Sequence, residues 1–370
     1  MTVQSSPNAD IWHCKQAAML LHFTSLEYIK GLHKLINDLI NGFVDPLLEL
    51  AESQGRDAVL INPVWGTRDT SANWGNNAWP ILKDLQAALA KDVALRSAGR
   101  FERTAVNECL RGIDQFSLDW TSPDEERILT MALQLLSVQA GKLDDTLSAA
   151  NDNRWSDYGF AYCYPSFAAQ QNRIPKFRIR TDIVCETGSL AAKTGVYISK
   201  DDPHAAVQFI CGGANGTPLR NAKTFSDIGL SALNYVGRDE LWFNFNKMFD
   251  FATLKQYDPV FHNWVFVDGL PRPDLAPSAV ARHAFIEQPQ KWHLLEPIDG
   301  EFHDLVSSPL PRLDDKTRHR IVGGEKCAIG GFYFTPSMMN SRRLFSPGEV
   351  TPAFDAKYGK TIWQWDANQE

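Results

Sequence analysis

The 370-residue chain has a formal net charge of -7 and is 44% hydrophobic and 22% charged, which is typical of a globular protein. A chain of this length can bury one or two cores without a metal or disulfide, and two domains are the default expectation. The acidic balance argues against direct binding of nucleic acid, because non-specific binding to phosphates needs a basic face. A basic protein partner fits this charge better.

No basic segment followed by an apolar signal core opens the chain, and no run of about 18 apolar residues occurs in it. We therefore expect a cytoplasmic protein that does not bind a membrane. The six cysteines have neither Cys-x-x-Cys nor zinc-like spacing. In such a chain this predicts reduced, mostly buried thiols and no disulfide framework.

The chain from about residue 10 to residue 150 is predicted to be helical. Apolar residues recur at three- and four-residue spacing from Ile29 to Phe43, which makes one apolar stripe until Pro46 breaks or kinks the helix. Stripes of this kind are typical of the core faces of a helical bundle.

Two further helices are predicted in this part. One begins at Asn77 or Ala78, because Pro80 would then lie in its first turn, where proline is favoured. The other runs from about Phe101 to Phe116.

The clearest helix start is Ser122-Pro123-Asp124-Glu125, which has a hydroxyl at the N-cap, proline at the first position and glutamate at the third. The helix is predicted to end near Asn151-Asp152-Asn153. Its expected core side consists of Ile128, Ala132, Leu135, Leu136 and Leu143.

From Trp155 onward, short strand-like runs separated by Gly, Pro and Asn predict a β-rich part. Residues 177–183 alternate between apolar and polar, which is the period of a half-buried strand. Residues 195–198 and 205–211 are expected to form a hairpin, because the polar segment 199–204 between them has a turn composition.

A helical interlude is expected between Ser226 and Phe251. Frequent prolines between 259 and 311 then argue against long helices and central strands over most of that stretch. The last predicted strands are 320–322 and 331–334. The sequence thus predicts an α+β protein, with an N-terminal α-helical bundle domain at 1–153 and a domain of short antiparallel strands at 154–370.

The sequence offers no recognisable catalytic constellation. It has no Gly-x-Ser-x-Gly, and the segment 211–216 lacks the features of a phosphate-binding loop and predicts a turn. Cys211 and Cys327 could meet a histidine such as His204 or His319 in space, but buried structural thiols are the commoner case. The spread of the other histidines predicts no metal site. We therefore expect no enzyme activity, cofactor or metal.

Residues for binding a protein partner are proposed on two loops. Asp201 and Asp202 lie in the predicted hairpin turn, and Asp239 and Glu240 lie in a break between helical runs. Acids in such places project into solvent, where they can attract a basic partner. The aromatic-rich surface around Trp242 or Trp264 is the next candidate contact.

The second half of the chain resembles the immunity protein families 71 and 72 of bacterial polymorphic-toxin systems. The resemblance covers roughly residues 155–352 and consists of short matches in the same order. The matching segments are Arg173–Asp182, Thr194–Tyr197, Asp201–Pro203, Gln208–Phe209, Gly229–Leu233, Val236–Arg238, Leu241–Trp242, Gly323–Cys327, Gly331–Pro336, Ser341–Arg343 and Gly348–Val350.

The resemblance implies a protein that binds and neutralises a cognate secreted antibacterial toxin in the cytosol of the producer, often beside a type VI secretion system. Such a protein needs a specific occluding surface and no chemistry of its own. Two alternatives stay open. One is an enzyme of unrecognised class that uses a Cys or His in the β-rich half, and the other is an adaptor protein of a secretion apparatus.

Overall fold

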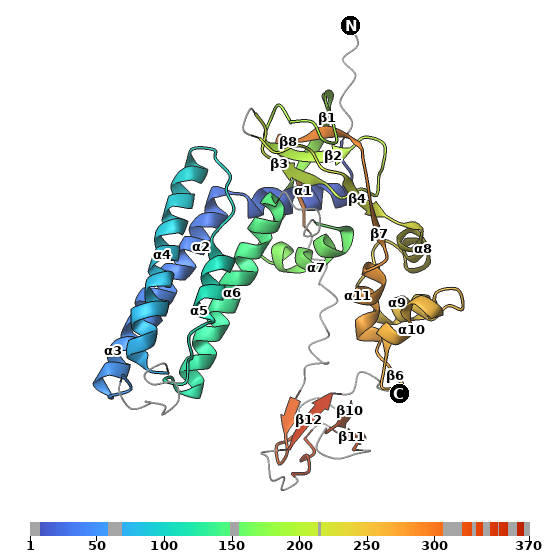
Figure 1. Cartoon of the computed structure of the whole chain (residues 1–370). Helices are drawn as coiled ribbons and strands as arrows, with labels where there is room; N and C mark the ends of the chain where they lie inside the picture. Colours follow the sequence, from blue (N-terminus) through green and yellow to red (C-terminus); the bar gives the residue numbers. More distant parts are fainter. Residues whose placement is uncertain are drawn as a thin grey trace. The chain divides into compact units, whose positions relative to one another are not determined.

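The computed structural model describes residues 8–57, 69–148, 155–213, 216–305, 320–327, 331–335, 341–346, 348–353 and 361–365 (Figure 1). The chain forms two compact units, Met1–Asp304 and Leu305–Glu370. Helices dominate the first half and antiparallel sheets the second, which confirms the α+β class. The predicted domain boundary after residue 153 lies outside the described residues and stays a prediction.

Helices precede the first strand, and most of them form a bundle in which α4 lies beside α2 (Figure 1). Their buried apolar stripes share one core, which includes Ile29, Leu82 and Leu136. In chain order these helices are α1 (Ile11–Phe23), α2 (Leu26–Leu39), the π-helical η1 (Ile40–Val44), α3 (Asp45–Ser53), α4 (Ser71–Ser97), α5 (Val106–Ile113), α6 (Pro123–Leu147) and α7 (Asp157–Ala168).

The kink expected at Pro46 is a π-helical turn. The N–H of Asp45 donates to the carbonyl of Ile40, so the chain widens by one residue and continues as α3 with Pro46 in its first turn. Proline has no N–H to donate to the preceding turn and its ring crowds that turn, so the wider π-helical turn accommodates it within the helix. The buried apolar residues of α2 and α3 therefore belong to one continuous helix.

Two predicted helix boundaries were wrong. Helix α4 begins at Ser71, because Thr70 Oγ1 accepts a hydrogen bond from the N–H of Asn73 at 3.2 Å and caps the helix. Pro80 is therefore inside the helix. The predicted 101–116 helix is shortened to α5, since Asp144 accepts from both N–H and Oγ1 of Thr104, at 2.7 and 2.8 Å, and holds that residue outside the helix.

The capping box at the start of α6 is confirmed, with reciprocal bonds between Ser122 and Glu125. Leu136 and Leu143 are buried as predicted, whereas Ile128 and Leu135 are exposed and do not face the core. The prediction joined two stripes on nearly opposite sides of one helix. The predicted helix end at 151–153 lies outside the described residues.

The segment after Trp155 was predicted to be strand-like, and this was wrong. Helix α7 forms there because Ser156 Oγ accepts a hydrogen bond from the N–H of Gly159 at 3.1 Å, which starts a helix. Its buried residues, such as Phe160, pack toward α1 and its neighbours. The aromatic content of the segment is typical of strands, but the cap determines the local structure.

The strands of the first unit are all antiparallel. The larger sheet has the order β1-β8-β2-β3, while β4 pairs with β7 and β5 with β6. The predicted strand at 177–183 and the predicted hairpin are confirmed by β1 and by the β2–β3 pair. The strands are β1 (Arg173–Glu186), β2 (Gly195–Ser199), β3 (Gln208–Ile210), β4 (Ala222–Phe225), β5 (Phe266–Val267), β6 (Leu270–Pro271), β7 (Phe285–Gln288) and β8 (Lys291–Asp304).

Strand β8 lies inside the larger sheet, but Pro297 lies where β8 pairs with β1 alone, so the exclusion of central strands that was predicted over most of this stretch holds at this proline. Strand β2 pairs only with the segment Trp292–Leu295 of β8. Pro297 lies beyond that segment, opposite Phe177 and next to a register shift in the β1 pairing. Its missing N–H is tolerated, since on the β2 side this part of β8 has no neighbour.

Short helices lie between β4 and β7 in the chain, and the first two of them confirm the helical interlude predicted between Ser226 and Phe251. They share a core that includes Phe225, Phe251 and Phe261. Helix α1 lies against β1, β2 and β3 and also contacts α6 and α7. The helices are α8 (Asp227–Val236), α9 (Phe245–Ala252), α10 (Asp258–Val265), the 3₁₀ helix η2 (Pro273–Leu275) and α11 (Ala276–Ala281).

The second unit has a small aromatic core. Tyr333 and Phe345 are buried with centroids 5.9 Å apart, and Trp363 meets Phe345 edge-on at 4.9 Å. The sheet is antiparallel with the order β11-β10-β12-β9, and it confirms the last two predicted strands. Its strands are β9 (Arg320–Val322), β10 (Gly331–Phe334), β11 (Arg343–Phe345) and β12 (Ile362–Trp365).

Candidate functional site

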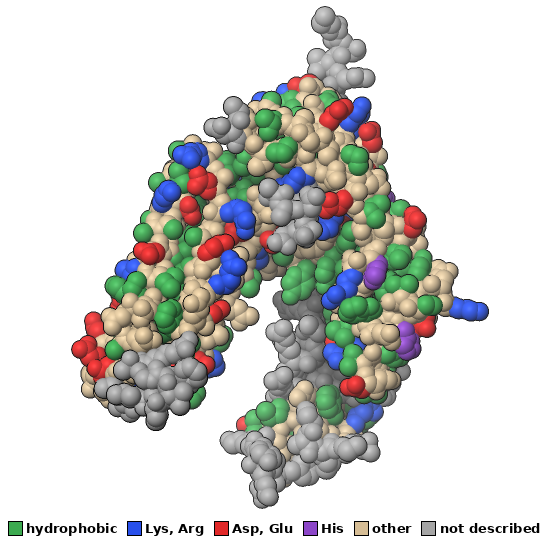
Figure 2. Space-filling model, in the orientation of Figure 1, with side chains coloured by type: hydrophobic (Ala, Val, Ile, Leu, Met, Phe, Trp, Pro, Cys, Tyr) green, Lys and Arg blue, Asp and Glu red, His purple; other side chains and the backbone are tan. Residues whose placement is uncertain are grey.

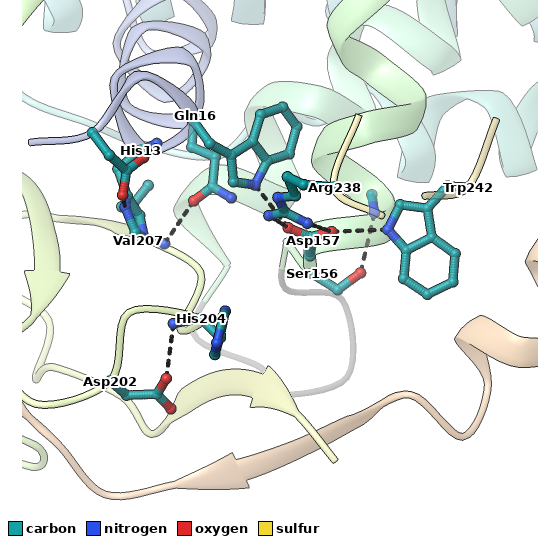
Figure 3. Close-up of polar contacts among 12 residues, drawn as sticks. His13, Gln16, Ser156, Asp157, Asp202, His204, Val207, Arg238 and Trp242 are labelled. Atoms are coloured by element: carbon teal, nitrogen blue, oxygen red, sulfur yellow. Dashed lines mark hydrogen bonds and ion pairs between the residues drawn. The ribbon is translucent and has the colours of Figure 1, made fainter. Parts of the chain in front are cut away.

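A buried carboxylate lies at the start of α7 (Figure 3). The Ser156 cap makes Asp157 the first residue of the helix, and Asp157 is only 2% exposed. A carboxylate removed from water is costly unless other groups pair with it and satisfy its oxygens. The surrounding donors therefore decide whether Asp157 acts as a free base or as a structural link.

Three side chains donate to Asp157. Trp12 Nε1 from α1 lies 2.7 Å from Oδ2, and Trp242 Nε1 lies 2.8 Å from Oδ1. The Arg238 guanidinium binds both oxygens, with Nη1 2.9 Å from Oδ1 and Nη2 donating to Oδ2. Each oxygen thus accepts two hydrogen bonds. The carboxylate links α1, α7 and the α8–α9 loop and has little capacity left for proton transfer.

Aromatic rings surround the Arg238 guanidinium. Its central carbon lies 5.0 Å from the centroid of the Trp12 ring and 5.9 Å from that of Phe225. Contact with the face of an aromatic ring stabilises a guanidinium, and the effect is modest here because the Arg238 side chain is 37% exposed to water. We call Trp12, Asp157, Arg238 and Trp242 the Asp157 junction.

Trp242 is buried, at 4% exposed, and has a left-handed backbone with φ 73°. For a bulky residue this conformation costs about 1–3 kcal/mol. The Nε1–H bond to Asp157 and the edge-on contact with Tyr158, at 5.3 Å between centroids, offset that cost. The proposal that Trp242 forms part of an exposed aromatic surface is therefore corrected. Its neighbours Phe243 and Phe245 are about half exposed instead.

The two aspartates of the β2–β3 loop have different surroundings. Asp201 is exposed, as predicted. Asp202 is partly buried and shapes the turn, because its Oδ1 accepts from the N–H of His204 at 2.8 Å and its own N–H donates to Ser199 Oγ at 3.1 Å (Figure 3). This is the usual role of Asp in a turn.

Asp239 and Glu240 are both exposed on the α8–α9 loop, as predicted. Glu240 forms an ion pair with Lys247 of α9, and the hydrogen bond from Lys247 lowers the pKa of Glu240. Asp239 lies close enough to Lys15 of α1 to oppose the lowering of the Lys15 pKa by burial. The negative charge of this loop is therefore partly balanced by lysines.

The two acidic loops meet at one aromatic ring. Phe225 lies 5.9 Å from the ring of His204, which follows Asp202, and 6.4 Å from the ring of Trp242. Helix α1 is also hydrogen-bonded to the β2–β3 loop, because Gln16 Oε1 accepts from the N–H of Val207 at 3.2 Å (Figure 3). We define the two-loop surface as Asp201, Asp239, Glu240, Phe243 and Phe245.

The thiols and histidines do not form an evident reaction centre among the described residues. Burial raises the pKa of the Cys211 thiol and so favours its protonated, weakly nucleophilic form. None of the six cysteines forms a disulfide, and Cys14, Cys109 and Cys327 are buried. His319 lies outside the described residues. In the described ranges no three His, Cys, Asp or Glu side chains gather as metal ligands, and no helix is both long and apolar enough to cross a membrane.

The chain was compared with known protein families, curated proteins and solved structures. No family model, curated protein or solved structure matches it.

Sequence reasoning missed Trp12, Asp157 and Arg238 as members of one cluster. A local signal for part of it exists: Ser156-Asp157-Tyr158-Gly159 has the same Ser-Asp-x-Gly pattern as Ser226–Gly229, which caps α8. That pattern would have predicted the helix start at Ser156. Nothing in it shows that Asp157 is buried, because Trp12 and Arg238 are distant in sequence.

Proposed function

We propose that this protein is an immunity protein that binds and neutralises a cognate secreted toxin by occluding it in the cytoplasm of the producing bacterium. The observation that carries the proposal is the α8–α9 part of the two-loop surface, where the half-exposed rings of Phe243 and Phe245 follow the exposed carboxylates of Asp239 and Glu240 within a few residues of chain. Aromatic residues are enriched among the energetically dominant contacts of protein interfaces. The resemblance in the second half of the chain supports the class of partner.

The Asp157 junction supports a binding role for this surface. It fixes the strained backbone of Trp242, and Phe243 and Phe245 follow directly in the chain. A loop that is rigid before binding loses less conformational entropy on binding, so more of the contact energy appears as affinity. Segments Val236–Arg238 and Leu241–Trp242, which belong to the resemblance, form this loop.

The charges support a protein partner with a basic contact face. Asp239 and Glu240 are exposed on the loop that carries the aromatic residues, and Asp201 is exposed on the β2–β3 loop. Exposed acids increase the rate of encounter with a basic surface. Over the bundle as seen in Figure 2, acidic and basic side chains are intermixed and no large basic patch is visible. A basic patch is what direct binding of nucleic acid would need.

The test is co-expression of the chain with the toxin domain encoded beside its gene. We expect protection of the cell and a stable complex of the two purified proteins. The double variant Phe243→Ala with Phe245→Ala should weaken binding by about 100-fold, since two contact aromatics are removed. The matched control is Phe302→Ala, which removes an exposed ring from β8.

A second variant tests the charges. Asp201→Lys with Asp239→Lys should slow association several-fold and make it less dependent on salt, with little change in the dissociation rate. Full protection by both double variants would exclude this surface. Failure of the wild-type chain to bind the toxin domain would contradict the proposed function itself.

A further inference from the structure

A histidine at the end of α1 lies where four helices meet. The ring of the half-buried His22 contacts Phe23 of α1, Tyr28 of α2 and Phe167 of α7, with ring centroids 5.7, 5.2 and 5.4 Å from its own. Lys142 of α6 completes the group, because its Nζ lies 5.7 Å from the centroid of the Phe23 ring and its charge acts on His22. We call these five residues the His22 joint.

The joint connects two parts of the first unit. Helices α2 and α6 belong to the bundle, and Tyr28 links them, because its hydroxyl donates to the backbone carbonyl of Gln139 at 2.8 Å. Helix α1 lies against the larger sheet, and α7 begins at the Asp157 junction. The contacts of His22 with Tyr28 and Phe167 therefore help to hold the bundle to the helices that support the sheet.

The groups next to His22 are poor sources of negative charge. Burial raises the pKa of the Tyr28 hydroxyl and of the Cys163 thiol on α7, so both groups stay neutral. Asp145 of α6 acts on Cys163, but burial and the neighbouring Asp144 raise the pKa of Asp145. Asp145 therefore loses its charge earlier than an ordinary carboxylate as the pH falls.

The other charged groups on these helices offer no counter-ion either. Glu27 of α2 is exposed and forms an ion pair with Lys30 at 2.8 Å. The charged neighbour on α1 is Lys15, another cation, about two turns away. Over the described part of the chain, the carboxylates that pair with a histidine are bound to histidines other than His22. A protonated His22 would therefore meet the charge of Lys142 without compensation.

We infer that the His22 joint is a pH-sensitive contact, which loosens when His22 takes up a proton. The proton gives the ring a charge among apolar neighbours and beside Lys142, and both effects oppose protonation of the folded state. Burial and then Lys142 accordingly lower the pKa of His22 from its usual 6.5. Because His22 is only half-buried, water can bring a proton to it without unfolding of the chain.

The joint should weaken as the solution becomes acidic. A histidine whose pKa is lowered by folding binds a proton more tightly in the unfolded chain. It costs no stability above about pH 7.5 and costs progressively more as the pH falls below 6.5. Asp10 and Glu125, with pKa values lowered to about 2, weaken the fold only below about pH 4.5. Asp92 acts in the opposite direction, because burial raises its pKa to about 6, so variants must be compared at equal pH.

The first experiment measures the titration of His22 by NMR of its ring Cε1–H in the full-length chain. His22→Phe assigns the signal or, if it does not fold, His22→Gln. We expect a midpoint below 6.5. Lys142→Met should raise the midpoint, because a neighbouring positive charge is removed, whereas Lys34→Met removes an exposed charge of α2 and should not. A wild-type midpoint at or above 6.5 would overturn the inference.

The second experiment measures the unfolding free energy of wild type and His22→Phe by chemical denaturation from about pH 8 to about pH 5. The two curves should run parallel above about pH 7.5 and diverge below 6.5, where wild type loses stability relative to the variant. The control is His283→Phe, at an exposed position, which should run parallel to wild type throughout. Parallel curves for wild type and a folded His22→Phe would contradict the pH-sensitive contact.

Hydrogen exchange locates the opening. At about pH 5.5, after correction for the intrinsic exchange rate, peptides from α1 and α7 should exchange several-fold faster than at about pH 7.5, while those from α4 stay unchanged. His22→Phe should remove the difference. Equal acceleration over the whole chain would show global unfolding and would overturn the opening at the joint. These measurements involve no toxin, so their failure is distinct from a failure of the proposed function.

Discussion

The helical bundle and the Asp157 junction are held together in different ways. The bundle core consists of apolar side chains spread over α2 to α6, and no single residue dominates it. The junction depends on one buried carboxylate that satisfies donors from α1 and the α8–α9 loop. The comparison teaches that an apolar core distributes its stability, whereas a buried charge concentrates it in one residue.

The bundle also contains an ion pair between Arg56 and Glu125, which adds to the stability that the apolar core provides. Arg56 Nη1 and Nη2 lie 2.7 and 3.2 Å from the Glu125 carboxylate and connect the segment after α3 with the start of α6. The Arg56 and Glu125 side chains are 20% and 19% exposed, so water still screens them in part. Substitutions at Asp157 and at Glu125 should therefore lower the unfolding free energy by different amounts.

The largest effect is expected for Asp157→Ala. It leaves the indole N–H groups of Trp12 and Trp242 without their buried acceptor and removes the counter-charge of Arg238, whose side chain is 37% exposed. A buried donor that loses its acceptor costs about 1–3 kcal/mol, and Arg238 adds little because water can solvate it, so we expect a loss of about 3 kcal/mol of unfolding free energy. Chemical denaturation followed by tryptophan fluorescence measures it.

The matched control is Asp227→Ala, because Asp227 occupies the same position in an identical Ser-Asp-x-Gly cap but is exposed. Its expected cost is below about 1 kcal/mol, from the interaction with the helix dipole alone. Equal losses in the two variants would show that Asp157 acts only through its helix and would contradict the junction.

Glu125→Gln should have the next largest effect, a loss of about 1.5–3 kcal/mol, because a hydrogen-bonded charge pair becomes a neutral contact. The hydrogen bond from Arg56 lowers the pKa of Glu125 from 4.5 to about 2. A lowered pKa stabilises the folded state above the unfolded value, so this contribution should be complete above pH 4.5 and disappear as the pH falls toward 2.

The control for this prediction is the neighbour Glu126→Gln, which changes an exposed carboxylate on the same turn. Denaturation curves of wild type and Glu125→Gln at several pH values give the difference directly. The difference should shrink between pH 4.5 and 2; a difference that stays constant with pH would disprove the role of the charge.

The smallest effect is expected for Trp242→Phe, at about 1 kcal/mol, because the ring is largely kept and only the N–H bond to Asp157 is lost. Trp264→Phe on α10 is the control, since Trp264 is exposed. In the double variant with Asp157→Ala, the Trp242→Phe cost should vanish, because its acceptor is already absent. Additive costs would argue against the hydrogen bond.

Much of the fold follows from local patterns. The capping box at Ser122, the hairpin of β2 and β3 and the kink near Pro46 were predicted because each depends on neighbours within a few residues. The errors have a different origin. Leu135 was assigned to the core because apolar spacing does not tell which of two stripes on one helix is covered, and α7 was missed because the aromatic content of its segment is typical of strands.

The acidic loop residues of the candidate site were also placed by local reasoning. Turn composition predicted that Asp201, Asp239 and Glu240 would be exposed, and they are. It did not predict that both loops meet at Phe225, or that Trp242 is buried, since these depend on contacts between distant segments.

The two Ser-Asp-x-Gly segments separate what the sequence determines from what the tertiary structure decides. At Ser156 and at Ser226 the same four-residue pattern starts a helix, because the serine hydroxyl satisfies an N–H group of the first turn wherever the segment lies. The sequence alone carries that information. The fates of Asp157 and Asp227 differ, because only the tertiary structure brings Trp12, Arg238 and Trp242 around the first and leaves the second in solvent. A hydrogen bond across a few residues can be read from their order, whereas burial depends on which distant surfaces pack together.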